Sequence, residues 1–272
     1  MIRFLRSALS VLVLALSFGT LNVFQIFSLL IGIFSKPAMR RFRFYLAELC
    51  SDVCIWWLVR VYGMRPKFHF DHLPPGENAL LIANHQVFAD VCVLMHFGSI
   101  FRRVGDLKFF AKDSLRWLPG PGWSLWFYDS IFLKRNWDSD TSRIEKTFAH
   151  IKNNDLPFWI VSFPEGTRAT PAKLAASTRY MQTLGIEPLR HHLCPRTKGV
   201  WATLDQLRGR VEAVYDLTID YHLPKAPSLW SFISGTLPNY SLTVKRYPIS
   251  EVPSEPEAQK QWLIDRFREK ES

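Results

Sequence analysis

Hydrophobic and polar positions divide this chain into two parts with different patterns. No charged residue occurs from Ser7 to Ser35, and at about 1.5 Å per residue this segment could cross a hydrocarbon core of about 30 Å. Small and polar residues interrupt the apolar run near its middle (Ser17, Gly19, Thr20 and Asn22), so a re-entrant hairpin is an alternative to one spanning helix. A cleaved signal peptide fits less well, because the run is long and lacks a small-x-small cleavage site.

The helical pattern continues in residues 44–62, where polar positions form a stripe. Arg41, Glu48 and Asp52 lie at helical spacing, and Trp56 and Trp57 are typical of a headgroup boundary. We interpret this segment as a helix lying in the membrane interface. A core helix of the following domain is the alternative. Residues 1–65 are therefore predicted to anchor the protein in a membrane through a helix or hairpin.

After Pro66 the pattern changes to short β-rich runs that alternate with helical stretches. The predicted strands are 79–83, 108–111, 158–163, 211–220 and 242–247, and the predicted helices lie near 90–97, 113–128, 140–153, 171–185 and 259–270. This alternation is typical of an α/β domain, which we assign to residues 66–272. No repeat of 20–50 residues is present, which excludes solenoids and propellers.

Composition supports one folded domain with a small appendage, and the placement of charge indicates the partner. The chain has 272 residues, of which 48% are hydrophobic, and four cysteines without a CxxC pair, which favours a reducing compartment over a disulfide framework. The net charge is +10, and residues 1–60 hold seven Lys or Arg against two acidic residues. Cations beside an apolar segment suit anionic phospholipid better than nucleic acid. The cluster after the apolar run (Lys36, Arg40, Arg41 and Arg43) predicts that the domain lies on the cytoplasmic side.

The first candidate for chemistry follows the predicted strand 79–83. Asn84 and His85 come directly after it, and Asp90 stands five residues beyond His85. If His85 lies in a strand-to-helix turn and Asp90 in the first helical turn, the carboxylate can bind Nδ1–H and leave Nε2 free to accept a proton. Because the chain has eight histidines, this spacing also arises by chance, and a purely structural histidine is the alternative.

The second candidate is the sequence Phe-Pro-Glu-Gly-Thr-Arg at 163–168, directly after the most hydrophobic predicted strand of the domain. Polar groups there would lie at the carboxyl edge of the sheet, where α/β folds bind ligands. Gly166 allows close backbone approach, and Arg168 offers two parallel donors to a phosphate. Two further basic segments, 132–135 and 194–199, are singly more typical of surface turns.

Taken in order, these blocks resemble the glycerophospholipid acyltransferase family, which includes the 1-acylglycerol-3-phosphate (lysophosphatidate) acyltransferases. The matches are NHxxxxD at Asn84, His85 and Asp90, IFxxR at Ile131, Phe132 and Arg135, FPEGTR at 163–168, and the proline of the fourth block at Pro195. The similarity covers roughly residues 70–222. Segments 195–199 and 213–218 look like the branch of acyl-CoA-dependent lysophosphatidylinositol and lysocardiolipin acyltransferases. Lys134 stands where many lysophosphatidate enzymes carry Asp, so the headgroup preference does not transfer.

The resemblance implies a glycerol-3-phosphate acyltransferase-like sheet flanked by helices and transfer of an acyl chain from acyl-CoA or acyl-carrier protein to the free hydroxyl of a lysophospholipid such as lysophosphatidate. It implies that His85 is the general base and Asp90 orients it. The implied acceptor site contains Asn84, Arg135, Glu165, Gly166, Thr167, Arg168 and Lys173, with Glu165 on the glycerol or orienting Arg168. No cofactor and no metal are expected. The absence of the C-terminal spanning helices of longer eukaryotic relatives looks like the compact bacterial members, which suggests a bacterial inner membrane.

Two other classes of function remain open from the residues alone. A non-catalytic lipid-binding or tethering protein would use the same cations, but it gives no reason for the spacing of His85 and Asp90. A membrane-anchored hydrolase would cleave a lipid or thioester with water as acceptor. The sequence does not indicate the oligomeric state.

Overall fold

The computed structural model describes residues 2–134, 136–223, 227–228, 230–231, 234, 236 and 239–271. The α-helices are α1 (Ile2–Phe34), α2 (Lys36–Trp56), α3 (Ala89–Ile100), α4 (Pro121–Phe127), α5 (Trp137–Asn153), α6 (Pro171–Thr183), α7 (Lys198–Gln206) and α9 (Pro256–Glu269). The strands are β1 (Lys67–Phe70), β2 (Ala79–Ala83), β3 (Leu107–Lys112), β4 (Ile131–Leu133), β5 (Trp159–Ser162), β6 (Ala213–Asp220) and β7 (Ser241–Pro248).

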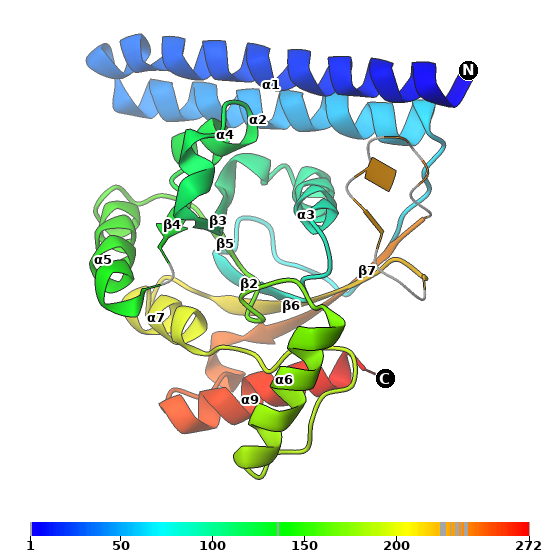
Figure 1. Ribbon diagram of the computed structural model, residues 1–272. Coiled ribbons are helices and arrows are strands. Elements are labelled where there is room, and N and C mark those ends of the chain that lie inside the picture. Colours follow the sequence, from blue (N-terminus) through cyan, green and yellow to red (C-terminus); the bar gives the residue numbers. More distant parts are fainter. Residues whose placement is uncertain are drawn as a thin grey trace.

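Within the described residues, seven strands form one sheet in the order β1-β7-β6-β2-β5-β3-β4 (Figure 1). The strands β6, β2, β5, β3 and β4 are parallel to one another, whereas β7 pairs antiparallel with β6 and parallel with β1. The carboxyl ends of β2 and β5 therefore meet at the same edge. This mixed α/β fold, with helices on both sides of a central sheet, confirms the predicted fold class.

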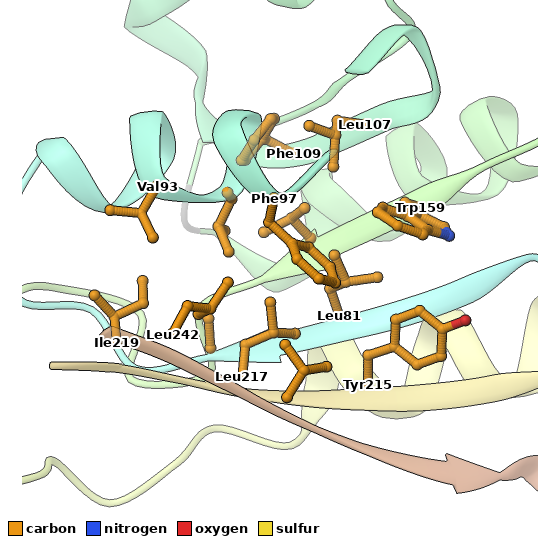
Figure 2. Close-up of a cluster of buried hydrophobic side chains, with 14 of the residues drawn as sticks. Leu81, Val93, Phe97, Leu107, Phe109, Trp159, Tyr215, Leu217, Ile219 and Leu242 are labelled. Atoms are coloured by element: carbon orange, nitrogen blue, oxygen red, sulfur yellow. The ribbon is translucent and has the colours of Figure 1, made fainter. Parts of the chain in front are cut away.

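Alternating side chains of the central strands build two separate cores. Leu81 of β2 and Val161 of β5 face α3, where Phe97 and Trp159 stack with ring centroids 5.3 Å apart (Figure 2). Leu80 of β2 belongs to the other core, beneath α5, α7 and α9. Because β2 is buried on both faces, it is a continuous apolar run, as expected for a central parallel strand.

The structure contains three elements that the sequence did not predict, and one predicted helix is wrong. The strands β1 and β4 and the helix α7 were not predicted, since each strand has at most four residues and β1 is largely exposed. The predicted helix 113–128 is wrong at its centre: a 3₁₀ helix, Asp113–Trp117, precedes α4. Pro119 and Pro121 cannot donate backbone hydrogen bonds, and Gly120 between them has a φ of +86°. The turn at Gly120 therefore separates the two helices.

The N-terminal region is a hairpin of two long antiparallel helices that lies across one side of the domain (Figure 1). The helix α1 runs unbroken through the polar residues near its middle, as in the interpretation of this segment as one helix and not in the alternative of a re-entrant break. The chain turns instead at Ser35, whose side chain accepts a hydrogen bond from the backbone of Ala38. By length and composition, α1 is the one described helix that could cross a membrane.

Polar residues of α1 face the domain. Asn22 donates to the carbonyl of Gly120 at 3.2 Å, and its Oδ1 accepts from the Gly120 amide at 2.7 Å. In α2 the Glu48 carboxylate is 1% exposed and accepts from the Val104 amide at 2.7 Å, while Asp52 pairs with Arg102. Part of the predicted polar stripe of α2 therefore contacts the domain. The segment thus has features of both interpretations, an interfacial helix and a core helix of the domain.

Candidate active site

His85 lies in the turn between β2 and α3, and Asp90 is the second residue of α3. His85 Nδ1 and Asp90 Oδ2 are 2.9 Å apart, so the predicted contact is present. The imidazole stacks on Phe163, with ring centroids 4.3 Å apart. Its side chain is 20% exposed, whereas that of Asp90 is fully buried. One face of the imidazole is therefore fixed by protein, and the ring still reaches solvent-accessible space.

Asp90 is held by more than the histidine. Its Oδ2 also accepts from the backbone amides of Gln86 at 2.6 Å and Val87 at 2.9 Å, and its Oδ1 accepts from the Tyr221 hydroxyl at 2.7 Å. Burial raises the pKa of Tyr221, and the nearby Asp90 charge raises it further, so this hydroxyl stays a donor at ordinary pH. The carboxylate thus orders the turn that carries His85. Tyr221 was missed from the sequence, because it lies 131 residues from Asp90.

Glu165 joins the two motif blocks through their backbones. It is 2% exposed, and its Oε1 accepts from the His85 amide at 2.8 Å while Oε2 accepts from the Leu193 amide at 3.0 Å. Both carboxylate oxygens thus accept hydrogen bonds from backbone amides. The predicted contact of Glu165 with Arg168 is not among its hydrogen bonds in the described residues. Glu165 therefore fixes the turns after β2 and β5 relative to each other.

Asn84 also has a structural contact. Its side chain is 1% exposed, donates to the Ile219 carbonyl at 2.9 Å and accepts from the Ile219 amide at 2.8 Å. These two bonds join the end of β2 to β6, directly before His85. The expected contact of Asn84 with an acceptor stays a prediction.

Gly166 adopts a left-handed conformation, with a φ of +67°, that a residue with a Cβ disfavours. A Cβ built there would lie 3.2 Å from Nε of Arg196, so the arginine occupies the space that glycine leaves. The Arg196 amide donates to the Pro164 carbonyl at 2.8 Å. The segment 194–199 therefore packs against the FPEGTR turn. Arg196 was not among the predicted site residues, although its proline-containing block was noticed.

The remaining predicted residues lie after this turn or outside the described part of the chain. Lys173 Nζ donates to Thr167 Oγ1 at 2.6 Å and to the Arg168 carbonyl at 3.3 Å, which closes the turn against the start of α6. The Arg168 side chain is exposed. Arg135 lies outside the residues that the structure describes, and its role stays a prediction.

A cleft of about 1480 Å³ connects these groups. His85 and the FPEGTR turn line it, together with several exposed cations, of which Lys112, Arg168 and Arg196 are here called the cationic rim. Its other lining is mostly apolar and extends to the hairpin, including Phe18 of α1. One continuous space thus contains a histidine, cations and an apolar wall. No cluster of three or more potential metal ligands occurs among the described residues.

Comparisons with known proteins identify the family. The acyltransferase family model matches residues 65–186, and the model of the acyltransferase C-terminus matches residues 231–272. The 1-acyl-sn-glycerol-3-phosphate acyltransferase 3 of Arabidopsis thaliana is 30% identical over 257 residues, which cover 92% of this chain and 68% of the plant protein. This chain belongs to the acyltransferase family. The resemblance seen in the motifs is confirmed, and the protein is an acyltransferase.

Further relatives agree with this assignment. The 1-acyl-sn-glycerol-3-phosphate acyltransferase delta of Bos taurus is 29% identical over 265 residues, covering 93% of this chain and 68% of the bovine protein. The crystal structure of the 1-acyl-sn-glycerophosphate (LPA) acyltransferase PlsC from Thermotoga maritima superposes with a TM-score of 0.54 and 16% identity, covering 97% of this chain and 96% of that one. This acyltransferase therefore shares the PlsC fold. The aligned length covers 97% of the chain and so includes the N-terminal helices.

Proposed function

We propose that the protein transfers an acyl chain from an acyl thioester, acyl-CoA or acyl-carrier protein, to the free hydroxyl of lysophosphatidate or a closely related 1-acyl lysophospholipid. The contact between His85 Nδ1 and the buried Asp90 carboxylate, at the wall of a cleft with cations beside it, carries this proposal. The names of the relatives support the acceptor.

In the proposed mechanism, the Asp90 carboxylate accepts a hydrogen bond from Nδ1–H of neutral His85, which leaves the Nε2 lone pair free. Nε2 takes the proton from the acceptor hydroxyl as its oxygen attacks the thioester carbonyl. The tetrahedral intermediate collapses, the C–S bond breaks, and the imidazolium returns its proton to the departing thiolate. The products are an ester and a free thiol, and no acyl-enzyme is needed because the thioester is already activated. General base catalysis of this kind contributes about 10²–10⁴-fold.

The acceptor phosphate would bind at the cationic rim. Lys112 is the last residue of β3, Arg168 ends the FPEGTR motif and Arg196 lies against Gly166, so three separate segments contribute cations to the rim. Guanidinium groups bind phosphate oxygens through two parallel hydrogen bonds. We expect Arg135, Thr167 and Lys173 to assist, Thr167 and Lys173 by fixing the turn that carries Arg168. Glu165 would act through the backbone, by holding the His85 turn in place.

The apolar part of the cleft would hold an acyl chain. Phe88, Val91 and Met95 of the α3 region line it from one side, and Leu14 and Phe18 of α1 line it from the hairpin. A chain in this space would have its carbonyl near His85 and its methyl end toward the hairpin. Leu14→Trp should then raise the ratio of activity with shorter acyl donors to activity with longer ones by about tenfold. The larger side chain should also lower the free energy of unfolding by about 1–3 kcal/mol through overpacking. Leu16→Trp, on an exposed face of the same helix, is the matched control. Equal donor profiles for both variants would contradict this assignment.

The hairpin would attach the protein to the membrane surface. Along α1 many apolar side chains are exposed, from Phe4 at 76% to Phe34 at 90%, while its middle is bonded to Gly120 of the domain. A helix fixed to the domain at its middle is better placed along a bilayer surface than across it. We propose this orientation with the cleft opening toward the lipid and the domain on the cytoplasmic face. The bacterial inner membrane stays a prediction from the sequence resemblance.

A two-readout assay separates this proposal from its alternatives. Purified protein is mixed with acyl-CoA, with and without lysophosphatidate, and both free thiol and lipid products are measured. Transfer requires thiol release that depends on the lysolipid and matches the diacyl product in amount. Thiol release without lysolipid would indicate a hydrolase. If neither acyl-CoA nor acyl-carrier protein gave free thiol under either condition, the protein would be a lipid-binding protein without this activity.

A further inference from the structure

A second cavity is lined by residues next to the turn that joins α1 to α2 and by residues of β3 and α5. Figure 1 shows this turn and α5 on the same side of the molecule. Its volume is about 740 Å³. Five cations line it: Lys36, Arg40, Arg41 and Arg43 from α2, and Lys108 from β3. Among the described lining residues it shares only Tyr128 with the cleft that contains His85. The cavity is therefore a separate site, which the proposed acyl transfer does not use.

The positive charge of this cavity is not balanced by its own acidic residues. In the described part of the chain, none of the five cations has a carboxylate oxygen within 4.0 Å. Of the two aspartates in the lining, Asp106 lies 2.5 Å from Arg103, and Asp129 lies 3.6 Å from Nε2 of His150. The cavity thus holds an excess of positive charge that an anion would neutralise.

Neutral partners hold two of these cations in position. Arg40 donates to Oδ1 of Asn154 in the turn after α5 at 2.6 Å. Arg43 donates to Oγ of Ser28 at 2.7 Å, and its guanidinium lies 4.8 Å from the centre of the Phe127 ring. Because these hydrogen-bond partners are uncharged, they fix the positions of both arginines without pairing them with a carboxylate. Such a preorganised pair costs little entropy when it binds an anion.

Lys108 adds a buried charge to the same space. It is 3% exposed, and its ammonium donates to the Tyr128 carbonyl at 3.4 Å. Burial lowers the pKa of Lys108, Asp129 and Asp106 raise it, and the positive charges of Arg103 and Arg40 lower it again. An anion in the cavity would relieve the repulsion between Lys108 and Arg40.

The surroundings indicate which anion fits. Leu29, Ile33 and Met39 also line the cavity, and Ile33 and Phe34 at the end of α1 are 74% and 90% exposed. An apolar border next to a positive cavity is suited to an anion that carries hydrocarbon chains. We propose that this cavity binds the phosphate headgroup of an anionic phospholipid of the bilayer, whose acyl chains lie along the end of α1, and that it anchors this end of the hairpin.

The test measures binding of soluble short-chain lipids to the full chain without acyl donor. The probes are dihexanoyl phosphatidylglycerol, dihexanoyl phosphatidylcholine and inorganic phosphate. We expect the anionic lipid to bind about tenfold more tightly than the zwitterionic lipid, since each cation near a lipid surface contributes about 1 kcal/mol. The cavity variant Lys36→Gln/Arg40→Gln should lose this preference. The control variant Arg60→Gln/Arg65→Gln, which removes two exposed cations outside the cavity lining, should keep it.

Three outcomes would overturn the proposal: equal loss in both double variants, which indicates general surface attraction; binding of inorganic phosphate as tight as that of the anionic lipid; or an unchanged preference in the cavity variant. Lys36 is exposed, so the single variant Lys36→Glu provides the same test if the double variant does not fold. Its preference should fall by about fivefold or more. Failure here leaves the acyl transfer proposal intact, because that proposal depends on the other cleft.

Discussion

The turn that carries His85 and the cationic rim border the same cleft but are built in opposite ways. Asp90 is fully buried and receives hydrogen bonds from two backbone amides and from Tyr221, in addition to its contact with His85. The rim residues Lys112, Arg168 and Arg196 are exposed and come from three separate segments. In the proposed reaction, the general base would therefore be held by buried hydrogen bonds, whereas exposed side chains would bind the acceptor.

The largest effect on activity should come from variants of the buried contact between His85 and Asp90. Asp90→Asn retains the shape of the side chain but removes the charge that stabilises the imidazolium, and His85→Ala removes the base. Each should lower kcat by about 10²–10⁴-fold with little change in KM for the acceptor. Steady-state kinetics with purified protein measure this. If His85→Ala kept more than about a tenth of the wild-type kcat, the general base role would have to be abandoned.

The difference between the two regions also explains what could be predicted from the sequence. The contact of His85 with Asp90 is local, since a buried strand, a turn and a helix start bring residues five apart together. Arg196 is different: its position depends on a bond between its amide and the Pro164 carbonyl, and on the space at Gly166. No short-range pattern encodes that contact.

The hairpin illustrates the same limit. Asn22 interrupts the apolar run of α1, which left a re-entrant hairpin open as the alternative to one continuous helix. Its side chain bonds Gly120, which is 98 residues away and lies in the Pro-Gly-Pro turn that divides the predicted helix 113–128, and also Gln25 and Ser124. The polar residue that looks like an interruption of α1 is therefore satisfied by a tertiary contact, which no local pattern encodes.

Variants of the exposed cationic rim should affect binding of the acceptor more than the chemical step. Arg168→Gln and Arg196→Gln should each raise KM for lysophosphatidate by about 10–100-fold, because a hydrogen bond to a charged group is worth about 1.5–3 kcal/mol. kcat should change much less. The control is Arg179→Gln, an exposed cation on α6 outside the described cleft lining. A parallel fall in kcat for the rim variants would place these arginines in the chemical step instead.

A pair of glycines sharpens the assignment of Arg196. Gly166 and Gly185 have nearly the same φ, +67° and +68°, but a Cβ at Gly166 would meet Arg196 at 3.2 Å whereas a Cβ at Gly185 would meet nothing within 4 Å. Both alanine variants should lose about 1–2 kcal/mol of stability from backbone strain. Only Gly166→Ala should also raise KM for the acceptor, by about fivefold, because it displaces the guanidinium. Identical kinetics in the two variants would show that the position of Arg196 does not matter.

The smallest effect on activity should come from Tyr221, which supports Asp90 without touching the cleft side of His85. Tyr221→Phe leaves Asp90 Oδ1 without its donor but keeps the Oδ2 contacts with His85 and the two amides. We expect the free energy of unfolding to fall by about 1–3 kcal/mol and kcat to fall by only about two- to fivefold. Tyr240→Phe is the control, since that hydroxyl bonds His96 at 2.8 Å, away from Asp90. If Tyr221→Phe reduced kcat as strongly as Asp90→Asn, the orientation of Asp90 by its Oδ1 partner, and not its charge alone, would control the base.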